Sequence, residues 1–350
     1  MKKILLFLFI FLLIISTVSA KKPDDKCFKS KEIKKVMLKA AEWQFANPKH
    51  ELYDWTNGAF YAGVSAAYRA TGNKRLLEEM IKMGEKNEWK PGPRLEHADD
   101  HVICQTYIDV YRIKNDQKMI DPFIQQITWW WCDALFMAPP ALVKLSMTTG
   151  DKKYMERSDV LYHECYDLLY DKDEHLFARD LGYVIKGDAS DRHEANGKKI
   201  FWSRGNGWVM GGLTLLLSEL PKDYKERPFY EKIYTEMAER IASLQQEDGL
   251  WRASLLDPAS YPGGEASGSG FYTFALTWGI NNGLLSAEKY LPVVRKAWKG
   301  LNSLIQPDGH MGWCQPIGAD PRKNFNAESW EVYGTGAFLL AGSEIIKLKK

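Results

Sequence analysis

The feature that most constrains this chain is an alternation between two kinds of helix-forming segment. One kind is rich in small and aromatic residues, as in 58–63 and 334–338, and the other is charged and amphipathic, as in 224–246. Glycine disfavours helices, so small-residue helices make sense only where backbones pack closely. The alternation therefore predicts an inner layer of crowded helices and an outer layer of amphipathic ones.

The spacing of apolar residues, with Gly, Asn or Asp at the stops, predicts about twelve helices. Short echoes support a repeat: 68–75 resembles 146–153, 246–251 resembles 306–313, and 265–276 resembles 328–339. Twelve helices in six hairpins predict an all-α fold, the (α/α)6 barrel. Strand signals are scarce, with 183–185 the best candidate. We expect helices near 31–46, 57–71, 74–87, 99–114, 117–128, 133–149, 151–170, 205–220, 225–246, 267–283, 286–304 and 329–347.

The N-terminus has the pattern of a signal peptide. Two lysines precede an apolar run over 4–15, and small residues end at Ala20. We expect cleavage after Ala20, export to the periplasm or medium, and one domain over 21–350. No second apolar run could span a membrane, so no membrane association is expected after cleavage. Removing Lys2 and Lys3 from 47 basic residues leaves them balanced with 45 acidic ones. This neutrality gives no electrostatic case for a nucleic-acid partner, and an anionic substrate would need a locally placed Arg or Lys.

The cysteines and histidines do not predict a metal or cofactor. The five cysteines include no CxxC pair, and the chain has no HExxH motif. Cys104, Cys132 and Cys165 lie in apolar helical segments, which favours buried thiols.

A toroid places the starts of its inner helices at one end, and in this chain those starts are rich in polar chemistry. Each of the six segments carries an acid or an arginine, and most have a tryptophan nearby. Carboxylates and aromatic faces around one opening suggest a site for an oligosaccharide. The alternative is that these acids are ordinary helix caps. The segments are 54–58, 97–101, 131–133, 201–208, 265–268 and 328–331.

Asp133 is the sharpest single candidate. Trp129, Trp130, Trp131 and Cys132 precede it, and the apolar segment 134–138 follows. Apolar surroundings raise the pKa of a carboxyl group, which suits a general acid near neutral pH. An N-cap of the next helix is the alternative.

Asp99 and Asp100 lie between two histidines at another helix start. A pair of adjacent acids exceeds what a cap needs, although capping and metal binding remain alternatives.

Arg204 lies between Trp202 and Trp208, and two glycines allow a close backbone approach. A guanidinium binds a carboxylate through two parallel hydrogen bonds. Pairing with a structural acid is the alternative for Arg204, and a core position is the alternative for both tryptophans.

Three blocks together, 100–101, 131–137 and 201–208, resemble glycoside hydrolase family 105, the unsaturated rhamnogalacturonyl hydrolases related to the family 88 unsaturated glucuronyl hydrolases. The resemblance covers about 31–347 and implies the (α/α)6 barrel. It implies action on oligosaccharides left by polysaccharide lyases, whose terminal uronic acid carries a C4=C5 double bond. C4 is protonated, water adds at C5, and the hemiketal opens. By this resemblance Asp133 donates the proton and then accepts one from water, while Asp100 assists. Substrate contacts are expected from Trp55, Asp99, His101, Trp202, Arg204, Asn206, Trp208 and Trp330.

The chain departs from the family at the segment after Leu176 and Phe177. Some members carry His-Gly there, whereas this chain has Ala178-Arg179-Asp180; a second departure lies at 122–127. These changes affect the subsite beyond the unsaturated sugar. Rhamnose, as in rhamnogalacturonan I of pectin, is the first expectation for the neighbouring sugar, and an ulvan-type or other unsaturated glucuronide is the second. Other classes stay open: a glycosidase or lyase of saturated chains, and a non-catalytic sugar-binding protein.

Overall fold

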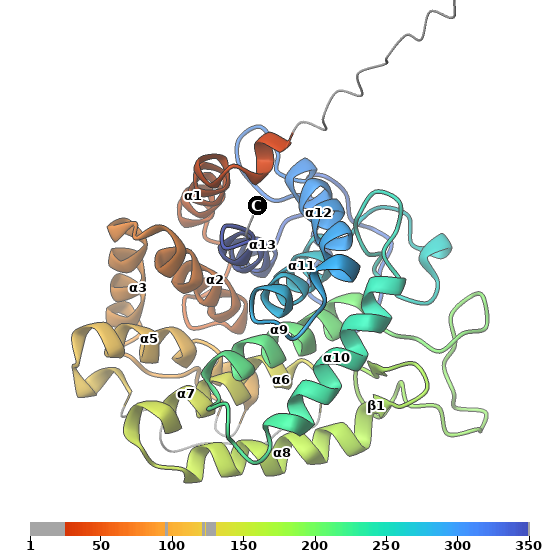
Figure 1. The fold of residues 1–350 in the computed structure, drawn as a ribbon, viewed down its shortest axis with the longest axis horizontal. Coiled ribbons are helices and arrows are strands. Elements are labelled where there is room, and N and C mark those ends of the chain that lie inside the picture. Colours follow the sequence, from red (N-terminus) through yellow and green to blue (C-terminus); the bar gives the residue numbers. More distant parts are fainter. Residues whose placement is uncertain (1–24, 95–96, 121–122, 124–130, 349–350) are drawn as a thin grey trace, which may run out of the picture.

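The fold is a ring of helices inside a second ring (Figure 1). A computed structural model describes residues 25–94, 97–120, 123 and 131–348. The six inner positions are held by α2 (Trp55–Thr71), α4 and α5 (Ala98–His101 and Cys104–Lys114), α6 and α7 (Ala134–Met137 and Pro139–Thr149), α9 (Ser203–Glu219), α11 (Ala266–Asn281) and α13 (Val332–Ile345). Outer positions are held by α1 (Ser30–Ala46), α3 (Lys74–Lys86), α8 (Lys153–Leu169), α10 (Arg227–Ser243) and α12 (Ala287–Ser303).

The inner helices close into a ring. Each packs on the next in the order α2, α13, α11, α9, α6 with α7, and α5, which returns to α2. The outer helices pack on this ring from outside (Figure 1). This arrangement confirms the predicted all-α fold and the (α/α)6 barrel.

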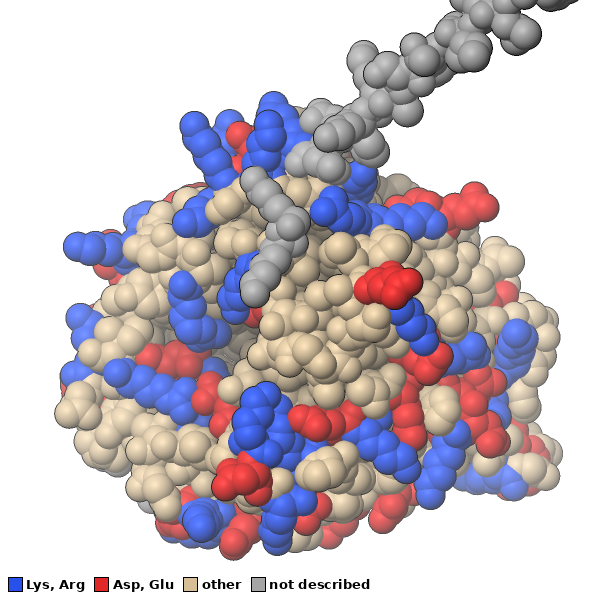
Figure 2. Space-filling view, in the orientation of Figure 1, with Lys and Arg blue, Asp and Glu red and all other residues tan. Residues whose placement is uncertain are grey.

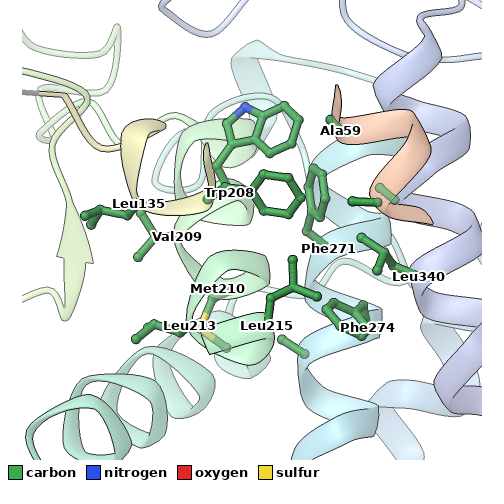
Figure 3. Packing of buried hydrophobic residues seen from close by; sticks show 14 of the residues in the cluster. Ala59, Leu135, Trp208, Val209, Met210, Leu213, Leu215, Phe271, Phe274 and Leu340 are labelled. Atoms are coloured by element: carbon green, nitrogen blue, oxygen red, sulfur yellow. The ribbon is translucent and has the colours of Figure 1, made fainter. Parts of the chain in front are cut away.

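Glycines allow the inner helices to approach each other closely. A Cβ atom at Gly63 would come within 2.3 Å of the Gly336 carbonyl oxygen, and one at Gly212 within 2.1 Å of the Leu135 carbonyl oxygen. Large apolar side chains fill the remaining interior, as Trp208 of α9 and Phe271 of α11 do, with ring centroids 4.4 Å apart (Figure 3). The small residues of the inner segments therefore serve backbone packing, as their sequence predicted.

Two expected long helices are each interrupted. The helix predicted over 133–149 breaks after Met137, because Pro139 and Pro140 lack the N–H groups needed to continue its hydrogen bonds. The amide of Gln105 donates to the freed carbonyl of Phe136 at 2.8 Å. The helix predicted over 99–114 divides into α4 and α5 around a turn at 102–103.

The strand expected at 183–185 is wrong. The described sheet instead joins β1 (Tyr170–Asp171) and β2 (Leu176–Phe177) in a short antiparallel hairpin at the end of α8. Tyr183 packs under the guanidinium of Arg192, 4.3 Å from its ring centroid, so the apolar residues of 183–185 serve loop packing.

Several expectations fall outside the described residues. The helix predicted near 117–128 begins with a 3-10 turn, η2 (Gln117–Met119), but most of its remainder is not described. Trp129, Trp130 and the signal peptide of 1–20 are also not described, so the peptide and the domain bounds 21–350 stay predictions. In the part of the chain that is described, no helix has the length and apolar character needed to cross a bilayer.

Candidate active site

The N-terminal ends of the inner helices form one end of the barrel, called here the N-terminal rim. Some of its acids are caps. Asp54 accepts a hydrogen bond from the Thr56 amide at 2.9 Å. Glu265 accepts from the Gly268 amide at 2.7 Å. At these two positions the helix-cap interpretation holds.

Asp133 precedes α6 but does not cap it. Its side chain accepts no capping hydrogen bond, and it is 7% exposed. The nearest basic group is Arg179, whose Nε lies 3.4 Å from Oδ2 of Asp133. Burial raises the pKa of Asp133, although the positive charges of Arg179 and Arg204 oppose that rise. Asp133 is therefore a buried acid that favours its protonated form more than a solvated aspartate does.

The adjacent acids Asp99 and Asp100 have different surroundings. Asp100 is bound by Arg94, which donates its backbone amide at 2.6 Å and its Nε at 2.9 Å. Asp99 has longer contacts, at 3.8 Å from Arg94 and 3.8 Å from His97. Burial raises the pKa of Asp99 to about 7, and the negative charge of Asp133 adds to this rise. Asp99 is therefore a carboxyl group that is electrostatically coupled to Asp133.

Arg179 also belongs to this group of charges, although its sequence context did not predict a role for it. It follows β2, and its main-chain carbonyl accepts a hydrogen bond from the Cys132 amide at 2.9 Å. This bond places the segment after β2 directly against the residue that precedes Asp133. The departure from the family pattern at Ala178-Arg179-Asp180 was the available signal, but the sequence does not show which element Arg179 meets.

Arg204 lies in the wall of the barrel and is 0% exposed. Its guanidinium donates to the carbonyls of Gln315 and Pro316 and to the hydroxyl of Tyr333. It also lies over the rings of Trp202 and Tyr333, 4.5 and 4.7 Å from their centroids. These internal partners tie α9 to α13 and the 315–316 segment. Direct contact of Arg204 with a substrate anion stays a prediction.

The four tryptophans predicted to contact substrate differ in how deeply they are buried. Trp208 is fully buried, and Trp202 is 3% exposed with its indole N–H directed to Gln315. Trp55 is half-buried and stacks on Tyr333 with ring centroids 5.4 Å apart. Trp330 is also half-buried and meets Lys49, whose Nζ lies 4.8 Å from its ring centroid. The structure thus leaves Trp55 and Trp330 as the more exposed rings of this set.

Asn206 and His101 are both fully buried. The side chain of Asn206 bonds both the amide and the carbonyl of Phe177, at 2.8 and 3.0 Å, and so holds β2 against α9. Burial lowers the pKa of His101 to about 4, so this imidazole is neutral at neutral pH. Their predicted contacts with substrate remain untested predictions.

The predicted buried thiols are confirmed at Cys104, Cys132 and Cys165. Within the described ranges, no cluster of three or more His, Cys, Asp or Glu side chains has a geometry suited to a metal ion.

A cavity of about 1000 Å³ lies at the opposite end of the barrel, among the C-terminal ends of the inner helices. Its charged groups bind one another: Lys144 lies 2.9 Å from Asp109, and Arg112 lies 3.0 Å from Glu219. Basic and acidic side chains are also interspersed over the face shown in Figure 2. Asp99 and Asp133, the two acids whose pKa values are raised, lie at the N-terminal rim. We therefore place the candidate active site at that end.

Comparison with known proteins agrees with this architecture. The model of Glycosyl Hydrolase Family 88 matches residues 29–349. A protein of Formosa agariphila named unsaturated 3S-rhamnoglycuronyl hydrolase is 47% identical, with 97% of each chain covered. A solved family 88 glycosyl hydrolase from Bacteroides vulgatus is 32% identical, covers 91% of this chain and 100% of its own, and has a TM-score of 0.84. A solved structure named as a polysaccharide lyase is 34% identical, covers 91% of this chain and 97% of its own, and has a TM-score of 0.83.

The burial of Arg204 predicts a large effect on stability. Arg204→Met keeps an apolar side chain but removes the donors to Gln315, Pro316 and Tyr333. Charge-assisted hydrogen bonds contribute about 1.5–3 kcal/mol each, so we expect a loss of unfolding free energy on the order of 3 kcal/mol. Urea unfolding measures it. Arg75→Met, which removes an exposed ion pair with Glu42, is the control and should have a much smaller effect, because solvent screens an exposed ion pair. Equal effects of the two substitutions would contradict the structural role of Arg204.

The raised pKa of Asp99 predicts a pH-dependent gain in stability for Asp99→Asn. An unfolded aspartate titrates near pH 4, whereas folding raises the pKa of Asp99 to about 7. Between these values the folded state binds more protons, so the contribution of Asp99 to stability falls as pH rises. We therefore expect Asp99→Asn to raise Tm relative to wild type more at pH 8 than at pH 4. Asp173→Asn, at an exposed position, is the control. A gain that is the same at both pH values would show that Asp99 is not the responsible group.

Proposed function

The chain belongs to glycosyl hydrolase family 88, whose members are glycosidases, and on that premise we propose that it removes an unsaturated uronic acid from the non-reducing end of lyase-generated oligosaccharides. The observation that carries the proposal is the environment of Asp133. Its carboxyl group is buried at the rim, accepts no helix-capping hydrogen bond and has a raised pKa. A raised pKa makes such a group a better proton donor than a solvated aspartate at the same pH, as delivery of a proton to carbon requires.

The proposed reaction uses Asp133 twice. The C4=C5 double bond is also a vinyl ether to the ring oxygen, so protonation at C4 by Asp133 creates oxocarbenium character at C5. The resulting carboxylate then accepts a proton from the water that adds at C5. The hemiketal formed in this way opens and releases the neighbouring sugar. Since the scissile bond is not attacked directly, the carboxylate separations that distinguish retaining from inverting glycosidases do not apply.

Asp99 is the proposed assisting residue, in place of Asp100. Its pKa near 7 and its coupling to Asp133 allow it to orient a sugar hydroxyl, whereas Asp100 is already bound by Arg94.

For the substrate we propose an unsaturated glycuronyl residue linked to rhamnose that carries sulfate at O3. The support is the 47% identity, over nearly the whole length of both chains, to the Formosa protein named for that chemistry. This choice favours the ulvan-type alternative over the unsaturated galacturonyl-rhamnose of rhamnogalacturonan I. The enzyme is tested with both disaccharides by following loss of the ultraviolet absorbance of the conjugated double bond. A lyase acting on a saturated polymer would instead make this absorbance rise.

Asp133→Asn should abolish most turnover. General acid–base groups contribute about 10²–10⁴ in rate, and one group with both roles should lie at or beyond the upper end. We expect kcat on the sulfated disaccharide to fall by at least about 10³-fold. The amide keeps the shape of the side chain, so thermal melts should show a folded protein.

Asp100→Asn and Asp99→Asn are the comparisons for Asp133→Asn. Asp99→Asn should lower kcat, but by less than Asp133→Asn does. More than about a tenth of wild-type turnover in Asp133→Asn would remove it from the proposed role, and an inactive, folded Asp100→Asn would transfer the role to Asp100.

The mechanism also predicts where solvent hydrogen enters the product. In deuterated water the released keto sugar should carry one deuterium at C4, because the proton on Asp133 exchanges with solvent before transfer. Mass and NMR spectra of the product measure its position. A product without deuterium at C4 would exclude hydration of the double bond.

A further inference from the structure

We propose that Arg179 is a specificity-determining residue that binds an anionic oxygen group of the substrate beside Asp133. This inference rests on the proposed function, because it adds a binding partner for the same substrate. The group is either the carboxylate of the unsaturated uronic acid or the sulfate ester of the neighbouring sugar. The carboxylate is planar and the sulfate is tetrahedral, and each presents two oxygen atoms that a guanidinium can bind through two hydrogen bonds.

The main chain holds Arg179 in a fixed position. Asn206 bonds the amide and carbonyl of Phe177, and the Ala178 amide donates to the Leu169 carbonyl at 2.9 Å. The Arg179 carbonyl accepts from the Cys132 amide at 2.9 Å. Three consecutive residues are thereby fixed to α9, α8 and the segment before α6. The side chain is restrained separately, by the bond of its Nη1 to Asp180 and the ion pair of its Nε with Asp133, which lowers the entropy lost on binding a ligand.

The guanidinium has donors left for a ligand. Its Nη1 donates to Asp180 at 2.8 Å, while its Nε lies 3.4 Å from Asp133 and makes no hydrogen bond within the described residues. Because the Nε is buried and faces the Asp133 carboxylate, a ligand oxygen would be bound by the solvent-accessible part of the guanidinium. The side chain is 22% exposed, which leaves it accessible from solvent.

The other arginines at the rim are already engaged. Arg204 is 0% exposed and donates to two carbonyls and a hydroxyl. Arg94 directs its backbone amide, its Nε and its Nη2 to Asp100. Since the charges of the chain nearly balance, recognition of an anion depends on a locally placed cation. The Nε of Arg204 also lacks a hydrogen-bond partner, but Arg204 is enclosed in the barrel wall, whereas the side chain of Arg179 is 22% exposed beside Asp133.

Anion binding by Arg179 also affects the acid. Asp133 faces the positive charges of Arg179 and Arg204, the carboxyl group of Asp99 and the thiol of Cys132. In the free enzyme the Arg179 charge favours the Asp133 carboxylate. A bound anion offsets this charge, so substrate binding should shift Asp133 towards the protonated form that the reaction requires.

Steady-state kinetics of Arg179→Gln and Arg179→Lys test the proposal on two disaccharides, one with and one without the sulfate. We expect Arg179→Gln to raise KM by about 10- to 100-fold on at least one of them, as loss of a charge-assisted hydrogen bond predicts. Arg179→Lys keeps the charge and should recover part of the loss. A KM effect that disappears on the desulfated disaccharide assigns the sulfate, and an effect that persists assigns the uronate. Arg75→Gln, which removes a distant arginine–carboxylate pair, should leave KM unchanged.

The pH profile separates binding from a merely structural role. Turnover requires protonated Asp133, so the alkaline limb of kcat/KM reports its pKa in the free enzyme. Arg179→Gln removes a charge that lowers this pKa, and the limb should therefore move to higher pH. Unchanged KM on both disaccharides with an unmoved alkaline limb, in variants that melt normally, would overturn the proposal.

Titration calorimetry distinguishes this inference from the proposed function. If wild type binds the disaccharide without turnover and Arg179→Gln loses that binding, the anion site stands and the hydrolase proposal fails. If wild type turns the disaccharide over and Arg179→Gln has its full affinity, the hydrolase stands and the anion site fails. If Arg179→Gln does not fold, Arg179→Lys decides by its KM and its alkaline limb. Wild type that neither binds nor converts either disaccharide would overturn both.

Discussion

Close packing of helix backbones in the inner ring is the constraint on which the rest of this structure depends. Where Gly63 meets Gly336, and where Gly212 meets the Leu135 carbonyl, no side chain fits between the helices. The ring can close only if small residues occupy such positions. Once it closes, the inner helices begin at the same end of the barrel, and residues far apart in the sequence are brought to one rim.

The rim then imposes two different environments on chemically similar acids. The amides of a helix start stabilise a carboxylate that accepts their hydrogen bonds, as Asp54 and Glu265 do. Asp133 and Asp99 lack these bonds. Asp133 is buried and Asp99 is half-buried, and the loss of solvent around each carboxyl group raises its pKa. The barrel thus uses some acids to stabilise its helices and leaves two others able to hold a proton. This difference comes from hydrogen bonding and burial, not from residue type.

The barrel and the burial of Asp133 could be predicted from the sequence because both depend on local patterns. Small-residue periodicity marks inner helices, and an acid between apolar residues marks a buried carboxyl group. The different surroundings of Asp99 and Asp100 could not be predicted, because they depend on the hydrogen bonds that Arg94 donates to Asp100 in the folded structure. The sequence also predicted a substrate contact for Trp208, whereas packing against Phe271 buries this ring fully. Arg179 was missed because its relation to Asp133 depends on one hydrogen bond between main chains distant in sequence, from Cys132 to Arg179.

That bond has a consequence for how such a site can change. Cys132 directly precedes Asp133, and its amide is bonded to the carbonyl of Arg179. The backbones that carry the acid and the cation are therefore held together. Asn206 extends this frame to α9 through β2. A substitution at 179 therefore alters both the anion that can be bound and the charge that Asp133 experiences. Under the proposed function, substrate choice and proton transfer are therefore coupled by geometry, and a new specificity at this position would also change the pKa of the acid.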